Sequence, residues 1–451
     1  MDQQEVLELC RSQSVELVRF IYCDFAGTQR GKVATIDDLE GRLEYGINMS
    51  TAHLGFTLHD TNVPIEGMLS VGENRLIADL DTFSVLPWMP GHAMVCCDFV
   101  ENDGAPYPAC PRTWLKNIVA RAAARGLRVQ AAFENEFYLA TQDAATGEWR
   151  PADRGGRYVE TALDKQGAFL ADLTRAVRAM GMTPEMVFHE GGPGQQEVAV
   201  RHAEALRAAD NQIKLRSTIR GVALQHGYHA SLAAKPFPWT YGSGAHVHMS
   251  LWDAATNTGL MHDPAAEGGF SLLGRQFVAG ILRHLPALVA LTCPSFNSYR
   301  RLVPRAWSTS DVCWGYDNRS AAVRVPSPYR GREQQSQNIE IKAVDPSCNP
   351  YVALGGIIAA GLDGIEQQLD PGPPLQRDPA DLTDDERDRL GIRPLSRTLR
   401  EAVGEFEADP LFHELMPDLL WRVYREVKLA ECDGFEARDD AYELETHFYA
   451  F

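Results

Sequence analysis

The chain has 451 residues, 45% of them hydrophobic, and its 61 acidic and 43 basic side chains give a formal net charge of −18. A chain of this length exceeds one ordinary hydrophobic core and predicts two domains or one large elaborated domain. The negative balance disfavours a nucleic-acid backbone or an anionic membrane surface as the main partner, and it is also what solubility alone would produce.

The first hundred residues carry strand patterns after a short opening helix. The predicted strands are residues 18–23, 32–34, 76–80 and 93–99, of which the first two form a hairpin around the turn at 24–27. Pro108 and Pro111 then mark a boundary. We therefore expect a small domain over residues 1–106 and a second, larger domain over residues 107–451.

From residue 107 onward, predicted helices and strands alternate. In chain order they are a helix at 112–125, a strand at 127–139, a helix near 166–181, a strand that reaches Val187, a helix near 201–227, a strand at 244–252 and a helix near 270–292. The proline-rich segment 370–374 interrupts the pattern, and the remainder is predicted to be helical and highly charged. This alternation predicts an α/β or α+β fold.

The cysteines and the N-terminus both favour an unexported protein. The nine cysteines contain no C-x-x-C pair and no framework spacing, and a chain of this size folds without covalent staples, so reduced thiols are expected. The start, Met1 to Glu5, is acidic where a secretion signal would be basic, and no stretch supplies about 20 consecutive apolar residues. We expect a cytoplasmic protein without a membrane-spanning segment.

Two glutamates, Glu134 and Glu136, stand two residues apart in the predicted strand at 127–139. Side chains alternate between the faces of a strand, so both carboxylates share one face. Neighbouring carboxylates in a mostly apolar setting repel each other and resist ionising together unless a cation lies between them. The pair therefore predicts a bound metal ion.

Three later segments carry further metal-ligating side chains: His189 and Glu190 with Glu197, His246 with His248, and Glu340. Taken alone, the glycine-rich segment 188–197 reads as a turn with incidental acids, and a single His-x-His pair is weak support for a metal site. An oxygen-rich ligand set with a single imidazole suits Mg²⁺ or Mn²⁺ better than Zn²⁺. Such metals usually serve phosphate chemistry.

Read together, these segments resemble the glutamine synthetase superfamily, in order along nearly the whole chain. The matching blocks are Glu134-x-Glu136, the His-Glu to Gln-x-Glu segment at 189–197, the Gly-Ser-Gly-x-His-x-His-Met-Ser segment at 242–250, Asn-Ser-Tyr-Arg-Arg-Leu at 297–302, Asn-Arg-Ser at 318–320, and the Asp-Pro to Asn-Pro-Tyr segment at 345–351. The resemblance implies an α+β fold with a small N-terminal β-grasp domain and a large catalytic α/β domain. It also implies subunits assembled into rings, as in a dodecamer, with active sites between neighbours.

The resemblance further implies ATP as co-substrate, two or three Mg²⁺ or Mn²⁺ ions per site, and a set of site residues. The metal ligands would be Glu136, Glu190 and Glu197 beside the amino-acid substrate, and Glu134, His246 and Glu340 on the ATP phosphates. ATP contacts would come from His248, Ser250 and Arg324, stabilisation of the transferring phosphoryl group from Arg319 and Arg324, and substrate contacts from Gly242, Arg301, Arg319 and Lys342. Fixed, always-charged guanidinium groups suit phosphoryl transfer, although an arginine taken alone reads as part of a surface ion pair.

Two positions depart from the ammonia-using members of the family. Ser50 or a neighbour stands where an N-terminal loop normally supplies an acid, and Trp307 stands where a glutamate normally covers the ammonium ion. An ammonium ion binds poorly without anionic partners, whereas Trp307 offers an apolar face or a cation–π surface. We therefore expect Ser50 and Trp307 to contact a primary amine larger than ammonia.

Two further departures concern the acid substrate. Tyr241 stands where an asparagine is usual, and Lys342 stands where an arginine normally helps to hold glutamate, a fork that lysine cannot reproduce. Glutamate is the first choice, and another carboxylate with the same reacting end is left open. The stretch 307–319 resembles FluG-type synthetase domains and bacterial γ-glutamyl-amide ligases more than housekeeping glutamine synthetase.

The leading hypothesis is an ATP-dependent ligase that forms a γ-glutamyl amide from glutamate and a primary amine through a γ-glutamyl phosphate. Glutamine synthesis from ammonia is the nearest alternative, a catalytically silent protein with the same fold is a second, and phosphoryl transfer to a guanidino compound is a third. The missing acids disfavour the first alternative. The retained metal ligands disfavour the second, because an idle site need not keep six costly polar groups in a cleft.

Overall fold

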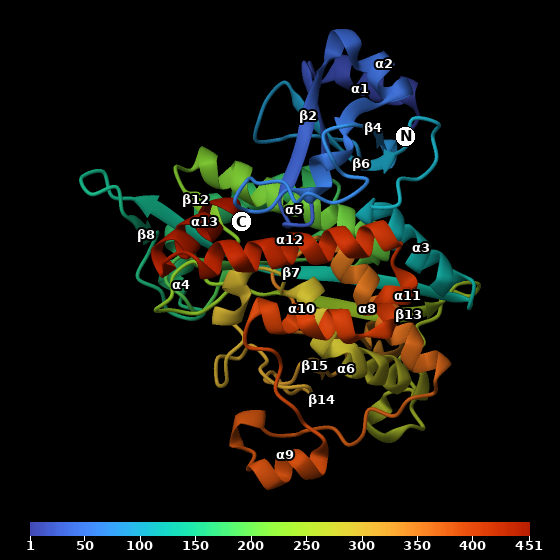
Figure 1. Cartoon of the computed structure of the whole chain (residues 1–451). Helices are drawn as coiled ribbons and strands as arrows, with labels where there is room; N and C mark the ends of the chain where they lie inside the picture. Colours follow the sequence, from blue (N-terminus) through green and yellow to red (C-terminus); the bar gives the residue numbers. More distant parts are fainter.

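The computed structural model describes residues 1–451, which form a small N-terminal layer on a much larger body (Figure 1). The elements of the layer are α1 (Gln3–Ser12), β1 (Leu17–Cys23), β2 (Gln29–Thr35), α2 (Leu39–Tyr45), β3 (Ile47–Ser50), β4 (Glu73–Ala78), β5 (Ser84–Val85) and β6 (His92–Val100). Its sheet has the order β2-β1-β6-β4-β3, with β5 also paired to β6. Strands β1 and β2 form the predicted antiparallel hairpin, and β1 runs parallel to β6.

The body is built on a ten-stranded sheet. Its strands are β7 (Leu127–Gln142), β8 (Trp149–Pro151), β9 (Pro184–His189), β10 (Gln195–Val200), β11 (Ala203–Glu204), β12 (His229–Ser231), β13 (Ala245–Asp253), β14 (Trp314–Tyr316), β15 (Val323–Val325) and β16 (Ile339–Ile341). Seven of them follow the order β14-β15-β16-β13-β7-β10-β9, while β8, β11 and β12 pair along β7. The long strand β7 therefore organises the sheet.

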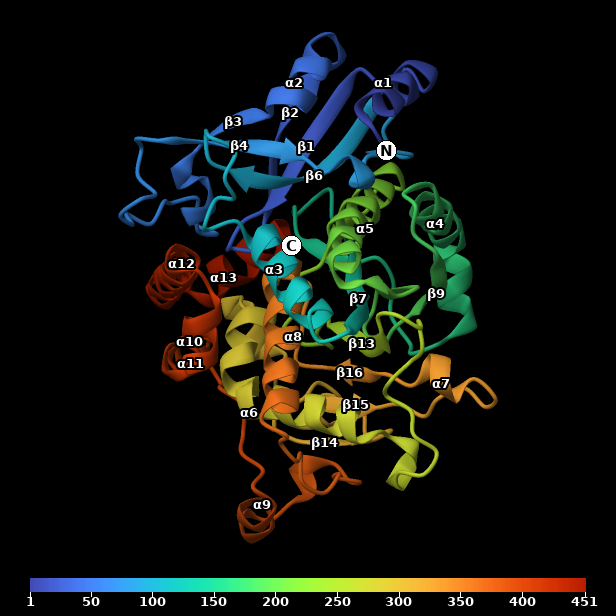
Figure 2. The same ribbon diagram turned by 90° about the vertical axis from the view of Figure 1, so that its right-hand side faces the viewer.

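Eleven helices accompany this sheet. They are α3 (Pro111–Ala123), α4 (Glu160–Ala179), α5 (Ala205–Gln225), α6 (Leu272–Thr292), α7 (Glu333–Ser336), α8 (Pro350–Glu366), α9 (Asp384–Leu390), α10 (Leu399–Ala408), α11 (Pro410–Leu415), α12 (Asp418–Glu436) and α13 (Asp440–Ala450). Helices α3 and α5 pack on β7, and α8 packs against α3, α5 and α6 (Figure 2). None of the helices combines the length and apolar character needed to cross a lipid bilayer.

Strand β7 turns one face to the core and the other to a cleft. Its odd-numbered residues at 127–137 are buried, whereas Glu134 and Glu136 on the other face are only partly buried. On the core side, buried Asn135 and Gln212 of α5 exchange two amide hydrogen bonds of 2.7 Å each. This reciprocal pair satisfies the buried amides and fixes the strand against the helix. Both carboxylates therefore emerge on the same side, as predicted.

A buried arginine joins the N-terminal layer to the body. Arg112 of α3 is 1% exposed and contacts Asp79 at 2.6 Å and Asp98 at 2.9 Å in the layer, and Asp210 of α5 at 2.9 Å. A buried guanidinium is stable only when carboxylates pair with it. Because one hydrophobic core also continues through both parts, the layer is held firmly on the body.

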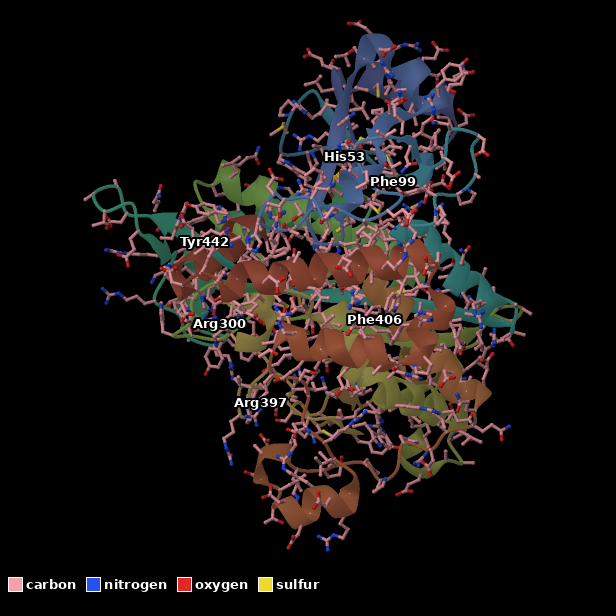
Figure 3. The ribbon with its side chains drawn as sticks, in the orientation of Figure 1. His53, Phe99, Arg300, Arg397, Phe406 and Tyr442 are labelled. Carbon is pink, nitrogen blue, oxygen red and sulfur yellow. The ribbon has the colours of Figure 1, made fainter.

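The C-terminal helices pack on one another through aromatic rings, among them that of Phe406, which is labelled in Figure 3. Phe406 of α10 stacks on Trp421 of α12 with ring centroids 5.8 Å apart, and its centroid lies 5.9 Å from that of Tyr424. Arg300, also labelled in Figure 3, contacts Glu443 of α13 at 2.6 Å. The helical C-terminal remainder predicted from the sequence is present, and its charged surface covers an aromatic interior.

The fold class is the predicted one: an α+β chain with a small N-terminal β-grasp domain followed by a large α/β domain. Three elements differ from the expectation. Residues 195–200 form strand β10 rather than continuing a turn, and the helix expected from residue 201 begins at Ala205, after β11. Helix α8 was not predicted, because it is apolar on nearly all sides and lacks an amphipathic period.

Candidate active site

A cleft of about 1640 Å³ lies over the outer face of the large sheet. Strands β7, β10, β13, β15 and β16 provide its floor. Its walls come from the segments 157–158, 239–242, 305–308 and 326–338. No residue of the N-terminal layer, 1–106, lines the cleft.

Strand pairing arranges the charged side chains of the floor in a row. The directly opposed pairs, in order across the sheet, are Glu197–Glu136, Glu134–His246, His248–Glu340 and Arg324–Glu340. Opposed residues on neighbouring strands have Cβ atoms about 5 Å apart on one face. The register therefore brings together five segments that are far apart in the sequence, and it unites all six predicted metal ligands except Glu190, which follows β9.

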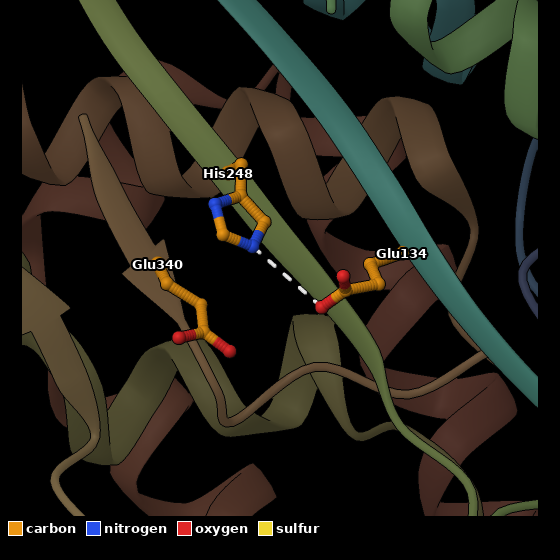
Figure 4. A group of neighbouring side chains, drawn as sticks. All are labelled: Glu134, His248 and Glu340. Carbon is orange, nitrogen blue, oxygen red and sulfur yellow. Dashed lines mark ion pairs between the residues drawn. The ribbon is translucent and has the colours of Figure 1, made fainter. Parts of the chain in front are cut away.

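Three of these side chains converge closely: Glu134, His248 and Glu340, whose ligand atoms lie within 4.8 Å of one another (Figure 4). His248 Nε2 is 3.6 Å from Glu134 Oε2, and its Nδ1 is 2.9 Å from Asn338 Oδ1. Burial opposes a charge on His248, but the hydrogen bond to Glu134 and the charge of Glu340 outweigh it and raise the pKa to about 9. At pH 7 the protonated His248 ring therefore supplies the positive charge that faces Glu134 and Glu340, and a metal ion held by the two carboxylates would take over that role.

His246 reaches the same cluster from the neighbouring position. Its Nδ1 lies 3.6 Å from Glu134 Oε2 and 3.5 Å from Glu340 Oε1. Burial and the nearby Lys342 lower its pKa to about 4, so the ring is neutral at pH 7 and has a lone pair for a metal. The resemblance places His246 on the metal and His248 beside the nucleotide; in the structure both rings are within reach of the two carboxylates.

Glu136 and Glu197 form a second acidic cluster on the paired strands β7 and β10. Burial raises the pKa of Glu136 to about 7, and burial with the charge of Glu134 raises the pKa of Glu197 well above its usual value. Glu136 accepts hydrogen bonds from Gly244 N at 2.9 Å and from Gln195 Nε2 at 3.2 Å. Two facing carboxylates that resist ionising together are a donor set that fits a divalent cation.

Glu190 completes this cluster from a braced loop. The backbone oxygen of Glu190 lies 2.8 Å from His189 Nδ1, and His189 Nε2 is 3.0 Å from Asp153. On the carboxylate itself, Gly191 N donates to Oε2 at 2.8 Å, and the Tyr158 hydroxyl donates to Oε1 at 3.2 Å. Sequence reasoning missed Asp153 and Tyr158, because loops rather than a strand period bring them to the site.

The basic side chains of the floor have distinct surroundings. Arg301 is buried, and its Nη2 donates to the Lys342 carbonyl at 3.0 Å, whereas its Nη1 has no hydrogen-bond partner. A buried donor without a partner is unfavourable unless a ligand supplies the acceptor. Arg324 Nη1 bonds Glu340 Oε2 at 2.9 Å, and Lys342 Nζ lies 3.4 Å from Glu340 Oε1.

The remaining predicted residues divide into those inside the cleft and one outside it. Gly242, Ser250, Arg319 and Trp307 line the cleft. Ser50 does not: it ends β3 in the N-terminal layer, where its hydroxyl accepts a hydrogen bond from Ala52 N. A substrate contact of Ser50 is therefore absent within one copy of the chain.

Trp307 does not stand alone at the cleft wall. Its side chain is 53% exposed, and the guanidinium carbon of Arg157 lies 4.3 Å from its ring centroid and 5.0 Å from that of Tyr241. Arg157 gave no signal in the sequence beyond the preceding glycines, Gly155 and Gly156, which have φ of 78° and 128° and allow the sharp bend.

Two family models together match nearly the whole chain. A family model described as "Glutamine synthetase, catalytic domain" matches residues 108–447, and one described as "Glutamine synthetase N-terminal domain" matches residues 1–107. The chain is similar to "Glutamine synthetase" of Halobacterium salinarum, with 33% identity over 100% of this chain and 97% of the relative. It is also similar to "Gamma-glutamylpolyamine synthetase GlnA3" of Streptomyces coelicolor, with 36% identity over 95% of this chain and 92% of the relative.

Solved structures give the same picture. The structure titled "Crystal structure of novel glutamine synthase homolog" superposes with a TM-score of 0.85 at 31% identity, covering 97% of this chain and 99% of that one. The structure titled "GmaS/ADP complex-Conformation 1" superposes with a TM-score of 0.84 at 27% identity, covering 98% of both chains. Both solved structures therefore share this fold along nearly the whole chain.

Proposed function

The chain belongs to the glutamine synthetase family of ATP-dependent ligases, and we propose that it joins glutamate to a primary amine larger than ammonia, forming a γ-glutamyl amide. The observation that carries this proposal is the wall beside Glu190. There Trp307 stands where the resemblance expects a glutamate to cover the ammonium ion, and the cation of Arg157 lies between the rings of Trp307 and Tyr241 and the carboxylate of Glu190.

In the proposed reaction, the γ-carboxylate of glutamate attacks the γ-phosphoryl group of ATP and releases ADP. The amine nitrogen then attacks the acyl phosphate, phosphate leaves, and the nitrogen gives up a proton. Arg319 and Arg324 would stabilise the charge on the transferring phosphoryl group. Arg301, with its unpartnered buried Nη1, would bind the α-carboxylate of glutamate.

The acidic clusters would hold the metal ions of the family. Glu136, Glu190 and Glu197 would form the site beside glutamate. Glu134, His246 and Glu340 would form the site beside the ATP phosphates, with His248 and Ser250 near the nucleotide. When bound, Mg²⁺ or Mn²⁺ would neutralise the phosphate charge and orient the reacting groups.

We also propose that the chain assembles into rings in which neighbouring copies complete each cleft. No residue of 1–106 lines the cleft of its own chain, so Ser50 reaches an active site only across a contact between copies. Light scattering coupled to size-exclusion chromatography measures the mass directly. A strictly monomeric protein with full activity would exclude this assembly and any substrate contact of Ser50.

The function is tested by phosphate release from ATP with glutamate and Mg²⁺, with mass spectrometry of the products. Ammonia, methylamine, ethanolamine, putrescine, spermine, isopropylamine and aniline are compared, and omission of glutamate gives the background. We expect at least one amine to outrun ammonia and to yield a γ-glutamyl amide. Turnover with ammonia alone would identify a glutamine synthetase, and ATP binding without turnover would identify a silent member of the family.

A further inference from the structure

Arg157 occupies an unusual position at the amine side of the cleft. Its guanidinium lies over the faces of two rings, 4.3 Å from the centroid of Trp307 and 5.0 Å from that of Tyr241. Its Nε is 4.0 Å from Glu190 Oε2, and this Nε is buried without a hydrogen-bond partner. A positive charge therefore stands between Glu190 and the wall that carries Trp307.

The backbone is shaped to accept this guanidinium. A Cβ on Gly191 would lie 2.8 Å from Arg157 Nη2 and 3.1 Å from Tyr241 Cδ2, so only glycine leaves room for the stack. A Cβ on Gly155 would lie 2.9 Å from the backbone of Pro193, which packs the loop before Arg157 against the loop after Glu190. The close packing at Gly155 and Gly191 therefore fixes the position of the Arg157 side chain between two loops.

The cleft offers no spare carboxylate to a second ammonium group. Its six carboxylates are Glu134, Glu136, Glu185, Glu190, Glu197 and Glu340. Five of them belong to the proposed metal sites, and the sixth, Glu185, contacts Arg201 at 2.9 Å. An amine with a distal positive charge would therefore face Arg157 without a compensating acid in this chain.

From this geometry, and resting on the proposed ligase function, we propose that Arg157 sets the charge selectivity for the amine. The preferred substrates are primary monoamines whose distal end carries an oxygen acceptor, such as a hydroxyl or carboxylate, and polyamines are rejected. The guanidinium of Arg157, which lines the cleft, supplies the donor for that oxygen, and its charge supplies the repulsion against a distal ammonium group. The chain would thus differ in substrate from the polyamine synthetase that it resembles.

Four three-carbon amines test the proposal at pH 8: β-alanine, 3-aminopropanol, propylamine and 1,3-diaminopropane. They share three carbons and differ only in the distal group, which is anionic, hydroxylic, apolar or cationic. We expect kcat/KM for amide formation to fall in that order, with β-alanine above 1,3-diaminopropane by about tenfold or more. The ratio of two kcat/KM values from one preparation is independent of the amount of folded enzyme.

Three variants assign the selectivity to Arg157. Arg157→Glu should invert the ratio in favour of 1,3-diaminopropane, and Arg157→Lys should keep the preference for β-alanine because it keeps the charge. Arg154→Glu is the matched control: Arg154 is exposed in the same loop, does not line the cleft and undergoes the same change of charge. This control should leave the ratio within about twofold of the original, because exposed charges outside the cleft are screened.

Three results would contradict the charge selectivity, the role of Arg157 or the proposed reaction. Amide formation in which 1,3-diaminopropane matches or exceeds β-alanine would overturn the charge selectivity and leave the ligase function standing. An equal change of ratio in Arg154→Glu and Arg157→Glu would assign the effect to the general field of the protein and overturn the role of Arg157. Failure of every amine, with or without turnover of ammonia, would overturn the proposed amide formation from amines and the selectivity with it.

Discussion

The floor and the amine-side wall of the same cleft are built by different means. On the floor, Glu136 and Glu197, like Glu134 and His246, stand opposite each other on paired strands, so the sheet register fixes their spacing. At the wall, the aromatic and cationic side chains come from the loops 155–158, 239–242 and 305–308. Loops are the parts of a fold that change sequence and conformation most readily.

This difference separates the chemistry of the reaction from the choice of substrate. Phosphoryl transfer needs several charges held at fixed distances, a demand that paired strands satisfy. In the proposed function, the choice among amines would depend on the groups at one wall, which loops can alter without disturbing the floor. Relatives that are named for glutamine synthesis and for polyamine ligation match the sequence of this chain over 95% or more of its length, in agreement with that separation.

The largest expected effect on activity comes from removing the charge of one carboxylate on the cleft floor. Glu136→Gln keeps the shape of the side chain and removes a proposed metal ligand, and we expect kcat for the best amine to fall by roughly 10³-fold. Glu160→Gln, at an exposed position of α4, is the matched control and should stay within about twofold. A Glu136→Gln enzyme that keeps more than a tenth of the activity would remove this residue from the metal site.

Metal binding to the floor should stabilise the fold in a pH-dependent way. Because burial raises the pKa of Glu136 from 4.5 to about 7, the metal-free protein should lose stability as the pH rises through this interval, since only the unfolded chain ionises freely there. Mg²⁺ must displace the proton, so it binds better above pH 7. At 100 times Kd the gain is about 2.7 kcal/mol.

Thermal unfolding with and without MgCl₂ at pH 6 and pH 8 measures this linkage. We expect the Mg²⁺-induced rise in Tm to be several degrees at pH 8 and clearly smaller at pH 6. KCl at matched ionic strength is the control for screening. An equal Mg²⁺ effect at both pH values would mean that the acidic cluster does not bind the ion.

At the wall, a carboxylate in place of Trp307 should shift the substrate preference from larger amines towards ammonia. Trp307→Glu restores a carboxylate at the position where the resemblance expects one, and we expect the ratio of kcat/KM for ammonia to that for the best amine to rise by about tenfold, because an anionic partner favours the small cation. Trp307→Phe keeps a ring and should leave the ratio nearly unchanged. The wall would lose its assigned role if both variants behaved alike.

The smallest expected effect comes from disturbing the stack of the Arg157 guanidinium on its neighbouring rings. In Gly191→Ala the new methyl group meets Arg157 Nη2 at 2.8 Å, so the guanidinium must move. We expect the β-alanine to 1,3-diaminopropane ratio to fall by about threefold while the charge is retained. Gly167→Ala, on α4 with open space around it, is the matched control and should be neutral or slightly stabilising. An unchanged ratio in Gly191→Ala would separate the selectivity from the stacked geometry.

The sequence predicted the floor well because strand periodicity is a local property. The spacing of Glu134 and Glu136 and that of His246 and His248 placed each pair on one face, and the structure has them there. The partners of these strands were not predictable from the same pattern. Strand β16, which carries Glu340, has only three residues, too few for a periodic signal.

The wall was predictable only in part. Trp307 was identified because it replaces an expected acid, but Arg157 lies 150 positions earlier in the sequence, in a loop without a period, and nothing local indicates that the two meet. The role expected of Ser50 depends on a second copy of the chain, which one sequence cannot place. Loop-to-loop contacts depend on the complete fold, and local patterns do not encode them.

Side chains of β7 alternate between the core and the cleft, and this alternation limits which sequence changes the cleft floor can accept. One residue inserted between Glu134 and Glu136 would send one carboxylate to the core side, where Asn135 now pairs with Gln212, because every later side chain changes face. The floor can therefore accept substitutions but not single insertions or deletions. The wall loops have no such alternation, so they can lengthen or shorten one residue at a time, and new amine specificities can arise there while the ATP-consuming machinery is inherited whole.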